Sequence, residues 1–151
     1  YFDNGSINWN YRNLILYNNT WYYIHKGMIH WDYNGVVQYY QTKYCVKNGE
    51  VAWNYTGLAQ SEDGTWYYIK KGVVDYSHSG LIYYNNEWFY VDHGVINWDY
   101  CSLVLYNKRW YYVDHGKINW GYTDLVKYGE TWYYVIGILL MSFIIMVLGI
   151  M

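Results

Sequence analysis

Aromatic side chains are the residues of this sequence best suited to contact a ligand. The stretches EWFYVDHGVINWDY (residues 87–100) and RWYYVDHGKINWGY (109–122) agree at ten of fourteen positions, so their aromatic residues recur at fixed spacing. A flat ring stacks on the apolar C–H face of a sugar, and it attracts a quaternary ammonium through a cation–π contact. The predicted ligand-binding residues are Trp88, Tyr90, Trp98, Tyr100, Trp110, Tyr112, Trp120 and Tyr122.

A second set of candidates consists of two Asp-His pairs, Asp92 with His93 and Asp114 with His115. If the turns that hold them stack, the four side chains could form a ladder of metal ligands. The corresponding turns elsewhere carry Lys26, Asn48 and Lys71 instead. We therefore interpret the histidines as solvated turn residues and predict no metal site.

Catalytic motifs are not found in the sequence. It contains no paired carboxylates in a distinctive context, no nucleophile elbow, no phosphate-binding loop and no histidine-rich ligand spacing. We predict no catalytic residues and no cofactor, and we expect that the chain is not an enzyme.

Composition narrows the class of protein further. The 151 residues include 24 Tyr and 10 Trp but only 3 Phe and no Pro, which favours rings with a polar group at a half-wet surface. The net charge is −2 and the 10 Lys and Arg are scattered, so the electrostatic signature of a nucleic-acid-binding protein is absent. Cys45 and Cys101 occupy different places in the repeat and do not indicate a disulfide framework.

The whole pattern repeats with a period of 22 residues, apart from one step of 23. Turn glycines mark the period, at Gly5, Gly27, Gly49, Gly72, Gly94 and Gly116. An aromatic residue follows each glycine after four residues, and a cluster such as WYYV opens the next unit. Residues 1–135 are therefore expected to form an array of about five full units with partial ends.

Within one unit, the pattern predicts a β-hairpin. WYYV (110–113) and KINW (117–120) are strand-like, and the DHG between them is a turn whose glycine supplies a positive φ. Alternation places Trp110 and Tyr112 on one face and Tyr111 and Val113 on the other, while Ile118 and Trp120 share a face. The stretch 121–131 suits a loop and a brief third strand. Because one hairpin is marginal in water, we expect an all-β solenoid of stacked hairpins, with tryptophans packed between them or lining grooves.

These units resemble the aromatic cell-wall-binding repeats of Gram-positive surface proteins, which include the choline-binding and glucan-binding repeats. The matching pieces are TG at 56–57, GTWYYI at 64–69, and TWYY at 20–23 and 131–134. Two departures stand out. Leu or Val (Val36, Leu58, Leu81) replaces the Trp that follows Thr-Gly in the family, and the unit is longer than the usual twenty or so residues.

The resemblance implies a non-catalytic module at the cell surface or in the cell wall. Its expected partner is a cell-wall polysaccharide or teichoic polymer, held in aromatic grooves between repeats, and choline itself depends on cages that the family builds with the replaced Trp. An alternative is a structural spacer or adhesin stalk whose rings stack only on each other. The sequence reads as part of a longer protein whose export signal lies upstream.

The repeat phase ends near residue 135, and IGILLMSFIIMVLGIM (136–151) carries no charge. We expect a short apolar C-terminal helix here and a candidate membrane segment. Sixteen residues reach about 24 Å, less than the roughly 30 Å of a hydrocarbon core unless the aromatic residues 132–134 extend the helix. The alternative is a reading-frame change that replaced the rest of the array.

Overall fold

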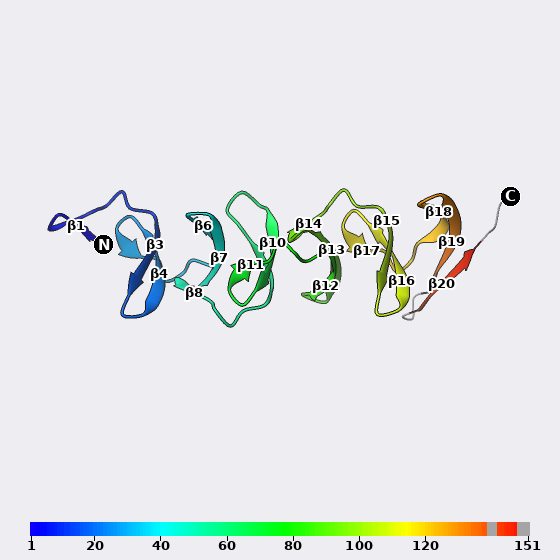
Figure 1. Ribbon diagram of the computed structural model, residues 1–151, viewed down its shortest axis with the longest axis horizontal. Helices are drawn as coiled ribbons and strands as arrows, with labels where there is room; N and C mark the ends of the chain where they lie inside the picture. Colours follow the sequence, from blue (N-terminus) through cyan, green and yellow to red (C-terminus); the bar gives the residue numbers. More distant parts are fainter. Residues whose placement is uncertain (139–141, 148–151) are drawn as a thin grey trace. The chain divides into compact units, whose positions relative to one another are not determined.

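The computed structural model describes residues 1–138 and 142–147, and these residues form β-strands and turns (Figure 1). The prediction of an all-β chain made of hairpin repeats is confirmed. The part of the chain that is described contains no helix long and apolar enough to cross a membrane.

The repeats are built from three kinds of strand. The first strand has four to six residues, the aromatic strand that follows it has five to eight, and the return strand after the next turn has two. The first strands are β3 (Asn13–Tyr17), β6 (Gly35–Tyr39), β9 (Gly57–Gln60), β12 (Gly80–Tyr84), β15 (Ser102–Tyr106) and β18 (Thr123–Tyr128). The aromatic strands are β4 (Thr20–His25), β7 (Thr42–Lys47), β10 (Trp66–Lys70), β13 (Glu87–Asp92), β16 (Arg109–Asp114) and β19 (Thr131–Ile138). The return strands are β5 (Met28–Ile29), β8 (Glu50–Val51), β11 (Val73–Val74), β14 (Val95–Ile96) and β17 (Lys117–Ile118). At the ends lie β1 (Phe2–Asp3), β2 (Ser6–Ile7) and β20 (Ser142–Val147).

The aromatic strand pairs on both sides within its own repeat. The predicted WYYV–KINW hairpin is confirmed between β16 and β17, although only two residue pairs form around the turn. The stretch 121–131, expected to hold a brief third strand, contains β18, which pairs with β19 from Thr123 opposite Ile136 to Tyr128 opposite Thr131. Its counterpart one repeat earlier is β15, which makes five pairs with β16, from Ser102 opposite Val113 to Tyr106 opposite Arg109. This longer hairpin is closed by Asn107 and Lys108, both with positive φ, which is the type I′ geometry that suits the twist of paired strands.

The turn after the aromatic strand also joins neighbouring repeats. His115 and Gly116 have φ values of 47° and 76°, and the Gly116 carbonyl accepts a 2.8 Å hydrogen bond from the backbone N–H of Tyr90 in the preceding repeat. Lys117 then pairs with Phe89. The same 2.8 Å bond links Tyr23 to Gly49, so the turn that folds one repeat also attaches it to the one before.

The described residues divide into two compact units. Unit 1 comprises residues 1–77 with 93–95, and unit 2 comprises 78–92 with the described residues from 96 onward. Each unit has its core in small clusters between consecutive hairpins rather than in one centre. The fourth residue of the WYYV-type cluster in each aromatic strand is at most 1% exposed, at Ile24, Val46, Ile69, Val91, Val113 and Val135.

Alternation along the aromatic strand sorts side chains as predicted. Trp110 and Tyr112 pack in one cluster of unit 2, while Tyr111, Val113 and Ile118 pack in the other. The residues that replace the family's Trp belong to the core, with Leu58 1%, Leu81 3% and Val36 5% exposed. The departure from the family pattern therefore supplies aliphatic packing.

The one step of 23 residues is explained by a longer hairpin turn. β9 and β10 pair from Gly57 opposite Ile69 to Gln60 opposite Trp66, so Ser61 and Thr65 flank three turn residues where β12 and β13 have two. The Asp63 carboxylate accepts bonds from the Ser61 hydroxyl and the Thr65 backbone, which hold its pKa down at about 2. The extra residue is absorbed in the turn without changing the strand register.

The prediction of a C-terminal helix is wrong for the described residues of the segment 136–151. Residues 136–138 continue β19, and 142–147 form β20, which pairs with β19 from Tyr133 opposite Val147 to Ile138 opposite Ser142. Because β19 pairs with β18 on one side only, its other edge has free backbone hydrogen-bonding groups. The β-branched residues of β20 favour pairing with this edge over starting a helix. Residues 139–141 and 148–151 lie outside the described part.

Two glycines of unit 2 allow the destabilisation caused by strain in a turn to be measured separately from that caused by a clash with the preceding repeat. A Cβ on Gly116 would lie 2.8 Å from the carbonyl oxygen of Asn97, whereas Gly129 has φ 61° and no neighbour within 4 Å. We expect Gly129→Ala to lower the free energy of unfolding by about 1 kcal/mol and Gly116→Ala by about 2 kcal/mol more. Urea unfolding followed by circular dichroism measures both. Equal losses would show that close approach between repeats contributes nothing.

Candidate aromatic binding grooves

After each return strand of unit 2 a tryptophan is followed two residues later by a tyrosine, at Trp98 with Tyr100 and at Trp120 with Tyr122, and we call these W.Y pairs. The tyrosines of the W.Y pairs are structural. In unit 2 the ring centroids of Tyr112 and Tyr122 lie 3.7 Å apart, and those of Tyr90 and Tyr100 lie 4.0 Å apart. The Tyr100 hydroxyl donates a 2.9 Å bond to the carbonyl oxygen of Leu103. The Tyr122 hydroxyl likewise donates a 3.3 Å bond to the carbonyl oxygen of Leu125. Tyr100 and Tyr122 are thus held by a stacked ring on the preceding aromatic strand and by the backbone of the following hairpin.

The tryptophans of the W.Y pairs lie at the surface instead. Trp120 is 36% exposed and Trp98 is 41% exposed, so these residues are not buried in a seam between hairpins. Trp120 meets the ring of Tyr111 at 6.0 Å and 84°, and Trp98 meets Phe89 at 6.0 Å and 86°. An edge-to-face ring at the surface forms one wall of a corner that a ligand can enter.

Five aromatic rings of unit 2 line one groove of about 710 Å³, within the range of small-molecule sites. One of them, Tyr83, lies 5.2 Å from Trp88, and the other four form a box. Trp88 comes from the earlier repeat, and Tyr106, Tyr111 and Trp120 come from the next. The Trp88 and Tyr106 rings lie 5.1 Å apart at 61°, and those of Tyr106 and Tyr111 lie 6.5 Å apart at 62°. Arg109 is the one charged residue of the lining. The steeply inclined rings make a partial box.

Unit 1 repeats this arrangement at the equivalent positions Trp21, Tyr39, Tyr44 and Trp53. The Trp21 and Tyr39 rings lie 5.2 Å apart at 65°, and the Tyr44 and Trp53 rings lie 5.8 Å apart at 80°. Trp53 is 45% exposed. The box is therefore a property of the repeat rather than of one sequence context.

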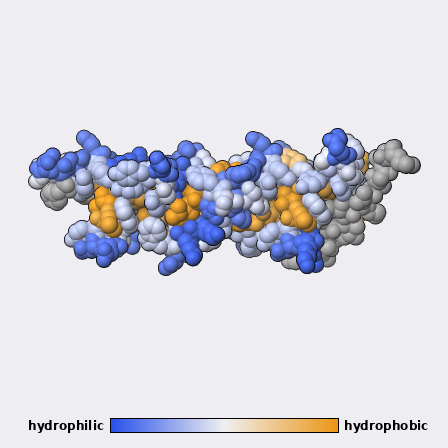
Figure 2. Space-filling model, in the orientation of Figure 1, coloured by the Kyte–Doolittle hydropathy of each residue, from blue (hydrophilic) through white to orange (hydrophobic). Residues whose placement is uncertain are grey.

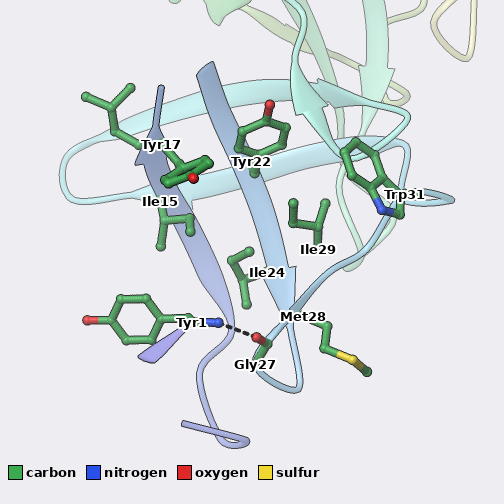
Figure 3. A pocket seen from close by; sticks show the side chains of 10 residues that line it. Tyr1, Ile15, Tyr17, Tyr22, Ile24, Gly27, Met28, Ile29 and Trp31 are labelled. Carbon is green, nitrogen blue, oxygen red and sulfur yellow. Dashed lines mark hydrogen bonds between the residues drawn. The ribbon is translucent and has the colours of Figure 1, made fainter. Parts of the chain in front are cut away.

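The first repeat has three of the four rings. Figure 3 shows Tyr17, Tyr22 and Trp31 along one side of a groove, with Ile24 and Ile29 below them in that view. Tyr22 meets Trp31 at 5.7 Å and 80°. Tyr17 is 63% exposed and Trp31 is 55% exposed.

Lys43 occupies the tryptophan position of another box. Its ammonium nitrogen lies 5.4 Å from the centroid of the Tyr67 ring and donates to the Gln38 side chain at 2.8 Å. Tyr67 in turn meets Tyr76 edge-on at 6.4 Å and 86°. Here the chain supplies its own cation to the aromatic surface.

The eight predicted ligand-binding residues are thus not equivalent in the structure. Trp88 and Trp120 line the unit 2 groove, and Trp110 lies 5.1 Å from Tyr128 just as Trp88 lies beside Tyr106. Trp98 lies on Phe89, while Tyr90, Tyr100, Tyr112 and Tyr122 form the stacked pairs. A ligand contact by any of them stays a prediction.

Sequence reasoning missed two residues of the box, Tyr106 and Tyr111. A signal was present, because tyrosine recurs at the end of the first hairpin strand, at Tyr17, Tyr39, Tyr84, Tyr106 and Tyr128. Its meaning depended on knowing that this strand pairs with the following aromatic strand.

The grooves are apolar with little charge. On the face drawn in Figure 2, hydrophobic residues reach the surface in separate patches bordered by hydrophilic ones.

Two tyrosines of the fold have raised pKa values. Burial raises the pKa of Tyr112 to about 12, with a further contribution from Tyr122. Burial also raises the pKa of Tyr33 to about 12, with a further contribution from Glu62. Both hydroxyls stay neutral over the physiological range.

The fold and the grooves define a class of protein, the tandem aromatic β-hairpin repeats. The model of the choline-binding repeat family matches six segments, residues 10–30, 32–51, 54–75, 79–97, 99–119 and 121–135. The chain belongs to the choline-binding repeat family, and each of the six matched segments corresponds to one repeat.

One solved structure gives a comparison at low similarity. Choline binding protein F from Streptococcus pneumoniae is 22% identical, with a TM-score of 0.33 over 83% of this chain. This chain spans 43% of the length of that protein. No curated protein matches the chain significantly in sequence.

The raised tyrosine pKa values predict loss of stability in alkali. Unfolded tyrosine ionises near pH 10, whereas Tyr112 and Tyr33 in the fold ionise at about 12. The unfolded state therefore releases these protons first, and their stabilising contribution is complete below pH 10 and lost between pH 10 and about 12. We expect the urea midpoint to fall across this window. Tyr112→Phe should make the fall shallower, and an unchanged slope would contradict the assignment.

Proposed function

We propose that this chain binds choline groups of a teichoic polymer in a Gram-positive cell wall, outside the cell. The observation that supports the proposal most directly is the box of inclined rings, Trp88, Tyr106, Tyr111 and Trp120, which recurs in unit 1. A quaternary ammonium has no hydrogen to donate, so it is recognised by several ring faces at once.

Two features support a polymer rather than a single small ligand. The boxes recur along the array, and one box alone would bind weakly, in about the millimolar range. Several boxes engaged on one polymer gain by effective concentration, by a factor of about 100 or more. Arg109 at the edge of the unit 2 groove would pair with a phosphate next to the choline.

The proposal includes a stacked arrangement of hairpins as a solenoid. Its support is the repeated junction within each unit, where the turn glycine accepts a bond from the preceding aromatic strand. A cell-wall glycan remains the second candidate ligand, because the same rings would stack on sugars. Contact of residues 136–151 with a membrane remains a prediction from their apolar composition.

The decisive experiment compares choline with 3,3-dimethylbutanol, which has the same shape but carries no charge. Cation–π recognition predicts that the chain is eluted from choline-coupled agarose by choline and not by the neutral analogue. We expect Trp88→Ala with Trp120→Ala to weaken binding by about thirtyfold at that groove, since each ring contributes about 1 kcal/mol. Trp9→Ala is the matched control, because Trp9 is 57% exposed and precedes the first hairpin.

Each outcome decides between the proposed functions. Equal elution by both compounds would rule out recognition of the charge. Binding to purified cell walls without any retention on choline would favour the glycan. A folded chain that binds neither would leave the structural spacer or adhesin stalk.

The Lys43 position gives an independent test of how the boxes work. Because the Lys43 ammonium already lies over Tyr67, we expect no choline there in the parent chain. Lys43→Trp should raise the number of bound choline molecules per chain by about one, measured by equilibrium dialysis. Lys43→Ala removes the cation without adding a ring, so a gain with alanine alone would show that the new indole is irrelevant.

A further inference from the structure

One turn of unit 2 gathers three different metal-binding side chains. Cys101 directly precedes β15, Asp114 ends β16 and His115 begins the turn after it. The Cys101 sulfur lies 3.7 Å from Asp114 Oδ1 and 3.8 Å from His115 Nδ1. His115 Nδ1 and Asp114 Oδ1 lie 2.7 Å apart. The three ligand atoms form a small exposed triangle.

The fold fixes the position of the sulfur in this triangle. At the same place in other repeats an oxygen caps the turn, as when the backbone N–H of Lys71 donates to Thr56 Oγ1 at 3.1 Å and that of Asn48 donates to Asn34 Oδ1 at 3.1 Å. In this repeat the N–H of His115 lies 3.3 Å from the Cys101 sulfur. Since sulfur is a weak acceptor, capping the turn does not favour cysteine over those residues.

The preceding repeat has the same Asp-His sequence without the thiol. There Ser79 occupies the place of Cys101, and its hydroxyl donates to Asp92 Oδ1 at 3.4 Å. The change from serine to cysteine therefore places a soft ligand, instead of a hydroxyl, beside a carboxylate and an imidazole. This comparison makes serine the natural replacement in a test.

We infer that Cys101, Asp114 and His115 form a zinc-binding site with water as the fourth ligand. In a tetrahedral zinc site with bonds of about 2.3 Å to sulfur and about 2.1 Å to nitrogen and oxygen, sulfur lies about 3.6 Å from the other ligand atoms. The two observed sulfur distances, 3.7 and 3.8 Å, match this geometry. The nitrogen and oxygen, at 2.7 Å, need to separate to about 3.4 Å as the metal replaces their hydrogen bond.

The surroundings of the triangle support this assignment. Asn119 Nδ2 lies 3.3 Å from the other carboxylate oxygen of Asp114, Oδ2, which leaves Oδ1 for the metal. Thiolate and imidazole select zinc over magnesium or calcium, which prefer oxygen ligands.

Binding has a defined proton balance. The S–H bond of Cys101 breaks, a Zn–S bond forms and the thiol proton passes to solvent. A neutral His115 that carries its proton on Nδ1 moves that proton to Nε2 through solvent and binds the metal with the freed nitrogen. About one proton is therefore released per zinc, and the affinity rises with pH. This inference replaces the sequence-based expectation of no metal at this turn and does not depend on choline binding.

The test is a Co²⁺ titration of the reduced, tag-free chain, followed by competition with Zn²⁺. We expect one equivalent of Co²⁺ to produce a near-ultraviolet thiolate-to-cobalt charge-transfer band, which Zn²⁺ abolishes. Cys101→Ser should eliminate the band and weaken zinc binding in calorimetry by about tenfold or more, because loss of even an outer partner costs about 10-fold. His115→Ala should weaken zinc binding similarly.

Matched controls make every outcome decisive. His93→Ala alters the equivalent turn of the preceding repeat and should leave the band unchanged. Cys101→Ser introduces the residue that occupies this place in the preceding repeat, Ser79, so unchanged circular dichroism is expected. Absence of a stoichiometric band in the parent, or zinc affinity unchanged by Cys101→Ser, would overturn the inference.

Discussion

The glycine of the turn between an aromatic strand and its return strand is the constraint on which the rest of the structure depends. Its carbonyl accepts a bond from the aromatic strand of the preceding repeat, and its N–H donates within its own, as Gly116 does to Tyr100 at 3.1 Å. The backbone N–H and C=O of this single glycine therefore both form hydrogen bonds, one within its repeat and one to the preceding repeat. A side chain at this point would collide with the preceding repeat, so the turn sets how closely consecutive hairpins approach. That spacing decides which rings can meet.

Close approach explains why the two members of a W.Y pair behave differently. Tyr122 stacks at 3.7 Å on Tyr112 and takes part in packing, whereas Trp120, two residues earlier, remains 36% exposed. Residues two apart normally share a face in a strand, but this segment follows the return strand β17 as a turn. The pair therefore contributes its tyrosine ring to the core and its tryptophan ring to the groove.

Much of the fold could be predicted from the sequence because its signals are local. The turn at His115 and Gly116, the hairpin that follows Trp110 and the separation of Tyr111 from Tyr112 all depend on neighbouring residues. The groove could not be predicted in the same way. It needs the five-pair register between β15 and β16, which brings Tyr106 beside Trp88 of another repeat. The tail was mispredicted because apolar composition does not distinguish a helix from a strand that pairs with an open edge.

The three-residue turn between β9 and β10 shows where this architecture tolerates a change in length. The additional residue leaves both strands in register, and Ile69 at the next core position remains fully buried. Insertions at these hairpin tips need not disturb the junction glycines, which lie in the other turn of the repeat. Duplication or unequal exchange of gene segments can therefore join units of 22 and 23 residues while every junction stays intact. For the same reason, the hairpin tips are suitable places to graft a peptide.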